Sequence, residues 1–264
     1  MMQVDSKRLP LPTVRYKHNP DYSNGKSGPT EPSGRAIWNI LDGQCFHTIK
    51  TKSLKYSIIQ TLDEIWDDHE VGSHMQDFEE RLKDQMSRRL CMSKQAITRL
   101  NPGVAASSLQ GDSFEKELDQ RLDEAQKAGA GLVILMLSEF DRSIYPRFKD
   151  LADRKYGLRS ICVAKPEQLD KKDQDIKKYM TNIAQKINLK YGGVNSAVDG
   201  IDLANTLILG ADVVHPPIAA FEGCPSIASL VGSMDSQGGM FLGSMRLQSK
   251  DKKDREVSAR LALS

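Results

Sequence analysis

Gly131-Leu-Val-Ile-Leu-Met-Leu137 is a continuous apolar run with a helical pattern on each side. Such a run is typical of a strand in a parallel sheet that is buried on both faces. Before it, residues 112–129 repeat apolar side chains at helical spacing, and Gly129 ends the pattern. After it, Pro146 opens a second helix and residues 160–163 form a short strand. The alternation predicts a doubly wound α/β domain.

Further segments extend this pattern in both directions. Short strands are expected at 36–40, 46–49, 56–59 and 95–100. Helices are expected where Met75, Phe78, Leu82 and Met86 share a face behind a capping Ser73, and where apolar residues repeat from Ile176 to Ile187. In doubly wound sheets, ligands gather beyond the carboxyl ends of the strands.

A second domain is indicated by Thr206-Leu-Ile-Leu-Gly-Ala-Asp-Val-Val-His-Pro-Pro217, which predicts a buried strand with one acid in its middle. A buried carboxylate is costly unless a metal or a cation pairs with it, so Asp212 is a candidate functional residue. An Asp facing water at a strand end is the alternative. Strands at 226–231 and 240–247 follow, and three strands cannot close a core, so this domain is expected to be truncated.

The bulk properties are those of a globular chain with one large or two modest domains. It has 264 residues, 39% of them hydrophobic, and no apolar run approaches the ~18–20 residues of a membrane span. The polar N-terminus has no apolar signal core, which argues against secretion. The four cysteines are widely spaced and predict reduced thiols. A cytoplasmic protein, with the nucleus as a further location, is expected.

Charge is unevenly distributed although the net charge is only +2. Residues 1–35 are rich in Pro, Gly, Ser and Lys and resemble a linker. Residues 62–90 hold nine acidic against four basic residues, whereas residues 142–190 hold thirteen basic against six acidic ones. The basic segment is either a footprint for a polyanion or a solvated lysine-rich surface.

Several motifs resemble those of the Argonaute/Piwi family, in the family's order along nearly the whole chain. Gly210-Ala-Asp-Val-Val-His-Pro216 resembles the first Piwi strand, and Val231-Gly-Ser-Met-Asp235 the second with its turn. Lys186-Ile-Asn-Leu-Lys-Tyr-Gly-Gly-Val-Asn195 resembles the end of the MID domain. Residues 4–16, Trp38-Asn-Ile40 and Phe46-His47 resemble the linker before MID. The resemblance implies linker at 1–49, MID at 50–198 and an incomplete Piwi domain at 199–264. The lysine-rich insertions suggest a fungal-type member.

The resemblance implies a Rossmann-like MID domain followed by a truncated ribonuclease-H-like Piwi segment, and it assigns a site in the basic segment. The residues are Tyr145, Lys149, Cys162, Lys186 and Lys190, which would bind the 5′-phosphate of a guide strand. The family's tyrosine also stacks on the first base. By spacing alone, the two i, i+4 pairs could equally be solvated helix faces.

The sequence departs from the family's pattern at one phosphate contact. Many members carry Gln where Ile161 stands, and isoleucine cannot bond a phosphate, so that contact is lost or passes to the hydroxyl of Ser160. Residues 138–143 occupy the place where the family reads the first base. They differ from the best-known animal form, so the base preference stays open.

Cleavage by the family needs two Mg²⁺ ions held by four clustered residues. Asp212 matches the first, and Glu256 is a candidate for the second, although the alignment there needs a small insertion. The other two would lie beyond Ser264. Asp235 is expected to be structural, and His215 a loop contact. This chain is therefore expected to lack enzymatic activity and a resident cofactor, with Asp212 binding metal only if the missing ligands are supplied.

The interpretation that follows is a fragment that binds the 5′-phosphorylated end of a small guide RNA in gene silencing. Its expected partners are this single-stranded RNA and the target RNA, with other silencing proteins as further candidates and with no membrane or DNA. A Mg²⁺-dependent endonuclease is the alternative of another class, and it requires the missing carboxylates. A truncated product that never accumulates is a third, because exposed strand edges favour aggregation.

Overall fold

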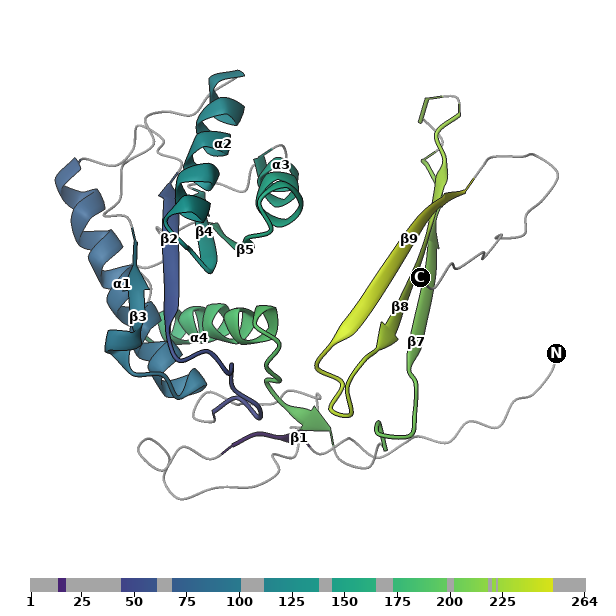
Figure 1. Cartoon of the computed structure of the whole chain (residues 1–264), viewed down its shortest axis with the longest axis horizontal. Coiled ribbons are helices and arrows are strands. Elements are labelled where there is room, and N and C mark those ends of the chain that lie inside the picture. Colours follow the sequence, from purple (N-terminus) through teal and green to yellow (C-terminus); the bar gives the residue numbers. More distant parts are fainter. Residues whose placement is uncertain are drawn as a thin grey trace. The chain divides into compact units, whose positions relative to one another are not determined.

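The apolar run of residues 131–137 forms β4 (Leu132–Leu137), and all six of its side chains are buried. β4 pairs in parallel with β2 (Leu54–Gln60) on one side and β5 (Arg159–Ala164) on the other. β3 (Ile97–Arg99) pairs in parallel with β2, so the strand order is β3-β2-β4-β5 (Figure 1). The prediction that this run forms a strand of a parallel sheet, buried on both faces, is confirmed.

The structure is a computed structural model of the chain. It describes residues 14–17, 44–60, 68–100, 112–137, 144–164, 173–198, 202–217, 220–221 and 223–248. The chain divides into two compact units, one built mainly on residues 39–195 and the other mainly on residues 196–264.

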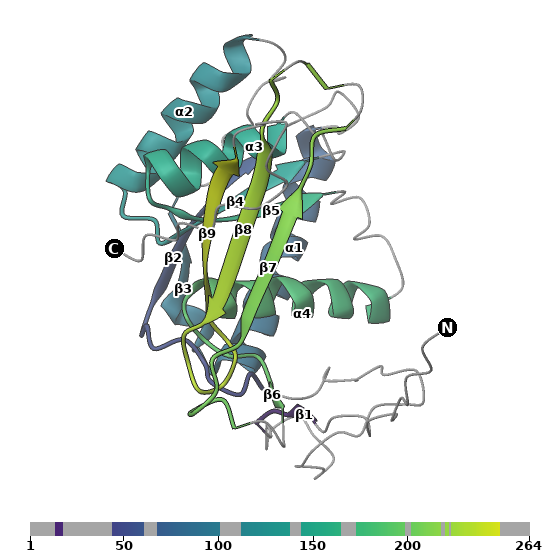
Figure 2. The ribbon, with the colours of Figure 1, turned by 90° about the vertical axis from the view of Figure 1, so that its right-hand side faces the viewer.

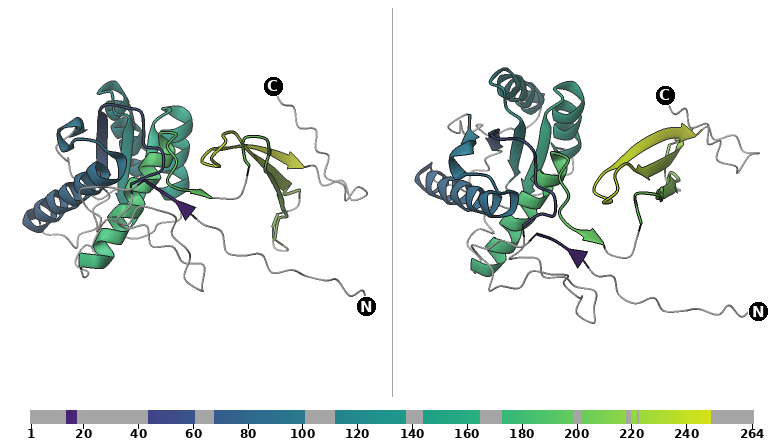
Figure 3. Two further views of the ribbon diagram at one scale, coloured as in Figure 1. Left: turned by 90° about the horizontal axis from the view of Figure 1, so that it is seen from below. Right: turned by 60° about the horizontal axis from the view of Figure 1, so that its bottom comes forward.

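Helices cover both faces of the parallel sheet. The α-helices among the described residues are α1 (Asp68–Leu90), α2 (Asp112–Lys127), α3 (Ile144–Lys149) and α4 (Asp173–Lys190). Alternate strand residues enter two separate cores, one shared with α1 and α4 and the other with α2 and α3. The two helix pairs accordingly lie on opposite sides of the sheet (Figure 3). None of the helices within the described residues is long and apolar enough to cross a bilayer.

Local details differ from the expectations. α1 begins at Asp68, so Ser73 lies inside the helix and does not cap it. Residues 46–49 form no strand, and His47 makes only an isolated bridge to Val194. The expected strand at 95–100 is shortened, because η1 (Lys94–Ala96), a 3₁₀ turn, takes its first residues. The expected strand at 36–40 lies outside the described residues.

A π-helix that the sequence did not predict follows α3 directly. This element, η2 (Asp150–Lys155), has hydrogen bonds five residues apart, such as the one from the N–H of Tyr156 to the carbonyl of Leu151 at 3.0 Å. π-helical turns are rare and often occur at functional sites.

The second unit contains two antiparallel sheets. β1 (Val14–Arg15) pairs with β6 (Ala197–Val198). β7 (Leu209–Val214), β8 (Ser226–Ser233) and β9 (Phe241–Gln248) form the other in that order (Figure 2). The expected three strands are confirmed, but the expectation of a buried first strand is wrong, since Leu209 is 58% exposed. The reason is that the described part of this unit contains no helix to cover either face.

Candidate functional site

α3 and α4 bring the predicted cationic residues to the amino-terminal half of β5. Tyr145 and Lys149 lie one turn apart on α3, and Lys186 and Lys190 lie one turn apart at the end of α4. The Nζ of Lys149 donates to Ser160, the second residue of β5, and the backbone carbonyl of Lys190 accepts from the side chain of Arg159, the first. Because β5 is an outer strand, the site lies along this edge of the sheet.

Lys149 is held by two hydrogen bonds to one residue. Its Nζ donates to the carbonyl oxygen of Ser160 at 2.7 Å and to the Oγ of Ser160 at 2.6 Å. The Ser160 hydroxyl donates in turn to the Oδ1 of Asp153 at 2.5 Å. The Oδ2 of Asp153 lies 4.0 Å from the Lys149 Nζ. An ammonium has three N–H donors, so one remains for a ligand.

Burial and the charged groups around Lys149 shift its pKa. Burial lowers the pKa of Lys149, and the ammonium groups of Lys190 and Lys186 lower it further, whereas Asp153 and Cys162 raise it. Burial likewise raises the pKa of the Cys162 thiol, against the opposing effect of Lys149 and Lys186. These effects indicate that the exposed ammonium groups of Lys186 and Lys190 lie near the half-buried ammonium group of Lys149. Such a cluster attracts an anion.

Tyr145 adds an aromatic face to the cationic cluster. Its side chain is 38% exposed, and the Lys149 Nζ lies 5.9 Å from the centroid of its ring. Phe148, on the same helix, is fully buried in the core shared with α2. The buried ring anchors α3, and the exposed ring can stack on a planar group. Residues 138–143, expected to read the first base, lie outside the described residues.

Consecutive residues of β5 point to opposite faces of the sheet. Ile161 is buried in the core shared with α1 and α4, so it offers the site no polar group. Cys162 is half-buried against the core on the α2 and α3 side. Ser160 is fully buried, and its hydroxyl is engaged by Lys149 and Asp153. The hydroxyl expected to replace the missing glutamine contact is thus turned toward the lysine.

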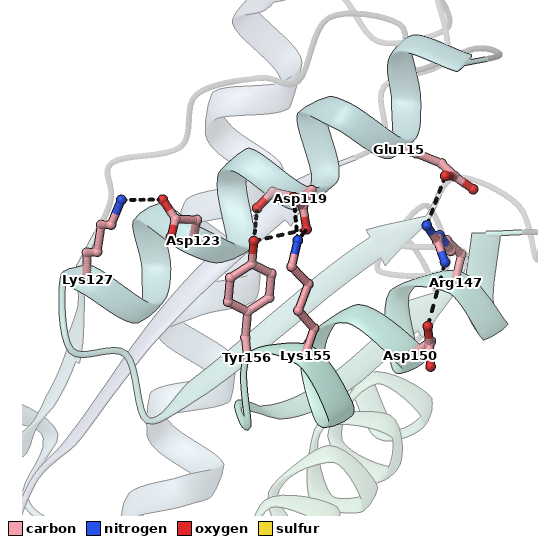
Figure 4. A network of polar contacts seen from close by, with 8 residues as sticks. All are labelled: Glu115, Asp119, Asp123, Lys127, Arg147, Asp150, Lys155 and Tyr156. Carbon is pink, nitrogen blue, oxygen red and sulfur yellow. Dashed lines mark hydrogen bonds and ion pairs between the residues drawn. The ribbon is translucent and has the colours of Figure 1, made fainter.

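Polar contacts tie α3 and η2 to α2 (Figure 4). The Nζ of Lys155 donates to both carboxylate oxygens of Asp119, at 2.6 and 2.7 Å, and the hydroxyl of Tyr156 donates to Asp119 Oδ1 at 2.9 Å. Arg147 donates to Glu115 at 3.0 Å. The hydrogen bond from Lys155 is the largest cause that lowers the pKa of Asp119, while burial opposes it. These contacts fix the helical segment without using the side chain of Lys149.

Sequence reasoning missed Asp153 and Arg159. Asp153 continues the four-residue spacing of Tyr145 and Lys149, and this signal was visible in the sequence. Arg159 donates from Nε to the carbonyl of Lys190 at 2.9 Å, and its guanidinium carbon lies 4.3 Å from the Tyr191 ring centroid. It places a further positive charge at the end of α4.

In the second unit, Asp212 is an exposed residue of β7. Its carbonyl accepts a hydrogen bond of 3.2 Å from the hydroxyl of Ser229, its partner on β8. Glu256 lies outside the described residues. The Nδ1 of His215 lies 2.9 Å from the Oγ of Ser226, a loop contact as expected. Within the described ranges, no group of three or more His, Cys, Asp or Glu side chains could hold a metal ion.

Asp235 organises the turn between β8 and β9. Its Oδ1 accepts hydrogen bonds from the backbone N–H groups of Gln237 at 2.7 Å and Gly239 at 3.2 Å, and its Oδ2 accepts one from Met240 at 2.5 Å. Burial raises the pKa of Asp235, but these N–H groups outweigh it and hold the pKa below its usual value. The prediction that Asp235 is structural is confirmed.

Comparison with known proteins places these features in context. Residues 132–258 match the Piwi domain family. Protein argonaute 5 of Arabidopsis thaliana is 27% identical over 247 residues, which cover 89% of this chain and 22% of that relative. The chain thus spans about a fifth of the length of this relative.

Solved structures show the same similarity. The crystal structure of the N. crassa QDE-2 AGO MID-PIWI domains is 25% identical, with a TM-score of 0.59 over 77% of this chain and 54% of that one. The structure of Kluyveromyces polysporus Argonaute with a guide RNA is 21% identical, with a TM-score of 0.65 over 91% of this chain and 29% of that one, and shows the fold alone. The chain is therefore a mixed α/β protein similar to the MID-PIWI lobe of Argonaute proteins, with a Piwi-domain match over residues 132–258.

Proposed function

We propose that this chain binds the 5′-phosphorylated end of a small guide RNA in RNA-mediated gene silencing. The observation that carries the proposal is that the Lys149 ammonium, 5.9 Å from the centroid of the exposed Tyr145 ring, lies within the electrostatic influence of Lys186 and Lys190. The similarity to plant and fungal Argonautes supports a silencing role. In this proposal the first unit has the Rossmann-like arrangement of a MID domain and the second begins a ribonuclease-H-like Piwi domain.

The chemistry of a terminal phosphate fits this cluster. Such a phosphate carries between one and two negative charges at neutral pH and three acceptor oxygens, so several ammonium groups can each donate to a different oxygen. An internal phosphodiester carries a single charge and has a nucleotide on both sides. The site therefore favours the end of a strand over its interior. Stacking of the first base on Tyr145 would add ~1–3 kcal/mol without regard to sequence.

The test compares two RNAs of one sequence, one with a 5′-phosphate and one with a 5′-hydroxyl, titrated against the whole chain. We expect tighter binding of the phosphorylated RNA, and we expect Lys190→Ala to remove about 1.5–3 kcal/mol of that advantage, the value of a hydrogen bond to a charged group. Lys178→Ala is the matched control, because Lys178 is an exposed lysine on the same helix that pairs with Asp175 at 3.7 Å. Equal affinities for the two RNAs would refute the proposal.

The target RNA enters the proposal as the strand that pairs with the bound guide. We propose that it contacts this chain through the guide, so its binding should depend on complementarity. A target strand added to the chain with a matched guide should be retained, whereas one added with a scrambled guide should not. Retention of the target without any guide would contradict this part of the proposal.

A further inference from the structure

The contacts of Lys149 carry an inference that rests on the proposed function and deepens it. We propose that Ser160 and Asp153 are positioning residues that hold the Lys149 ammonium in place, with one N–H left for the phosphate. The similarity to known proteins did not single out Asp153, and Ser160 was expected to touch the phosphate itself.

Ser160 provides two of the three acceptors that an ammonium can use. Both its carbonyl oxygen and its hydroxyl oxygen accept from the Lys149 Nζ, at 2.7 and 2.6 Å. Ser160 is fully buried on β5, paired with Val133 of the central strand, so these acceptors are rigid. If Lys149 moved away from β5, its Nζ would no longer donate to the two buried oxygens of Ser160. Losing these hydrogen bonds costs free energy, which keeps Lys149 in place.

Asp153 determines how the Ser160 hydroxyl is turned. A serine hydroxyl has a single proton, and the 2.5 Å contact with Asp153 Oδ1 takes it, since a carboxylate can only accept. The lone pairs of the hydroxyl then face Lys149. Without Asp153, the Ser160 hydroxyl could rotate until its proton faced the Lys149 ammonium. The hydroxyl proton and the ammonium would then repel each other.

The π-helical turn places this carboxylate. Asp153 follows Lys149 by four residues within η2, while Leu151 and Ala152 of the same turn are buried in the core beside α2. Because Leu151 and Ala152 are packed in the core, the position of Asp153 in the same turn is fixed as well. The contact of 4.0 Å between Asp153 Oδ2 and Lys149 Nζ shows that the carboxylate also lies close to the ammonium itself.

Positioning matters because a free lysine side chain has about 2 kcal/mol of rotamer entropy to lose. Lys149 loses this freedom when the chain folds, so binding the phosphate does not require it again. Lys186 and Lys190 are exposed at the end of α4 and are free of such hydrogen bonds among the described residues. Lys149 is consequently the fixed point of the cluster, to which the two other lysines add charge.

Several other groups face Lys149 and could also influence the position or charge of its ammonium. Among the described residues they are Lys186 and Lys190 on α4, Asp153 on η2, Cys162 on β5, and the rings of Tyr145 and Phe148 on α3. Of these, only Asp153 is joined to Lys149 through Ser160 by hydrogen bonds. The effect of Ser160 can therefore be separated from that of the surrounding charges.

The first test needs no RNA. In chain labelled with ¹⁵N-lysine, the Lys149 ammonium signal is assigned by its loss in Lys149→Arg, and its hydrogen exchange with water is measured by NMR. We expect exchange in Ser160→Ala to be about tenfold faster than in the unsubstituted chain, the equivalent of ~1.4 kcal/mol. Ser160→Thr keeps a hydroxyl and should restore slow exchange. Thr181→Ala is the control, because that buried hydroxyl bonds Gln85 instead.

Asp153→Ala gives a second variant at an exposed position, in case Ser160→Ala does not fold. It should also speed the exchange of the Lys149 ammonium, since the hydroxyl of Ser160 loses its acceptor. Unchanged exchange in a folded Ser160→Ala chain, or in Asp153→Ala where only that variant folds, would overturn the proposal.

The second test uses the 5′-phosphorylated and 5′-hydroxyl RNAs. Ser160→Ala should weaken binding of the phosphorylated RNA about tenfold, leave the hydroxyl RNA unchanged, and be rescued by Ser160→Thr. If the unsubstituted chain does not distinguish the two RNAs, the proposed function fails, while the exchange measurement still judges the positioning of Lys149. If the unsubstituted chain distinguishes them and Ser160→Ala does so equally well, the positioning proposal fails.

Discussion

The side-chain amide of Asn188 donates a hydrogen bond of 3.0 Å to the Oδ1 of Asn195, across the turn that ends α4. The same amide donates to the carbonyl of His47 at 3.0 Å, and its oxygen accepts from the N–H of Ile49 at 3.1 Å. Asn188 is fully buried. One side chain thus joins residues 47–49 to the end of the helix that carries two lysines of the candidate site.

Asn188→Ala should destabilise the first unit substantially. The substitution leaves the buried N–H of Ile49 without its partner, which costs about 1–3 kcal/mol. The carbonyl of His47 and the side chain of Asn195 each keep another hydrogen-bond partner. We expect a loss of about 1–3 kcal/mol in urea unfolding followed by circular dichroism. Gln120→Ala is the control, since Gln120 is exposed on α2 and its bond to Glu124 should contribute less than ~0.5 kcal/mol. A loss no larger than that of the control would contradict the role of Asn188.

Gly193→Ala should be destabilising for a related reason. A Cβ at Gly193 would lie 2.2 Å from the Oδ1 of Asn188, and the buried amide has no room to retreat. Overpacking of this kind costs about 1–3 kcal/mol. The double variant Gly193→Ala/Asn188→Ala removes the clashing group, so its loss of stability should be smaller than the two single losses added together. Simple additivity would show that the strain lies elsewhere.

Glu79→Ala should destabilise the contact between α1 and β3. Glu79 pairs with Arg99, and both side chains are largely buried. The hydroxyl of Tyr56 lies 3.4 Å from Glu79 Oε2, and burial, followed by the charge of Glu79, raises the pKa of Tyr56. Removing Glu79 leaves the guanidinium uncompensated, at a cost of about 3–5 kcal/mol. Glu80→Ala, next to it on the exposed side, should have little effect in the same denaturant titration.

The Asp119 network should make stability depend on pH at the acidic end. The hydrogen bond from Lys155 lowers the folded-state pKa of Asp119 below its ordinary value. A lowered pKa means that the contribution is present above the unfolded pKa of ~3.9 and is lost as pH falls through the folded value. Asp119→Asn should therefore be slightly less stable than the unsubstituted chain at pH 7, by less than ~1 kcal/mol because the pair is exposed. In melting curves the difference in stability should shrink as the pH falls below ~3.9. A difference that grew on acidification would contradict the lowered pKa of Asp119.

Periodicity predicted the first unit well because its core strands are continuous apolar runs. Leu132–Leu137 was recognised as a doubly covered strand, and the stop at Gly129 has a backbone φ of +77°, which favours glycine. The π-helix after Lys149 could not be predicted, because its residues have the same composition as an α-helical turn. The start of α1 was misjudged because Ser73 resembles a cap, while earlier residues extend the helix.

The sequence indicated which residues belong to the candidate site, but it did not indicate how their side chains contact one another. The i, i+4 spacing of Tyr145 and Lys149 placed both on one helix face, and α4 supplied the other lysines as expected. Spacing could not show that Lys149 donates a hydrogen bond to Ser160, since this contact depends on the path of the chain from η2 to β5. The exposure of β7 was also unpredictable, because an apolar strand looks the same in sequence whether or not another element covers it.

The final prediction concerns Asp212. Cleavage of the ribonuclease-H type uses two metal ions ~3.5–4 Å apart, held by several clustered carboxylates. Asp212 is an exposed residue of β7, and the described residues bring no group of three or more metal-ligating side chains together. We propose that one exposed carboxylate at this position cannot hold two metal ions, so this 264-residue chain, incubated with guide, complementary target and Mg²⁺ or Mn²⁺, should leave the target intact. Asp212→Ala should not change guide binding, because Asp212 lies in the other unit from the cationic cluster. Guide-dependent cleavage at a single phosphodiester, abolished by Asp212→Ala, would contradict this prediction and would mean that Glu256 or a second chain completes the metal site.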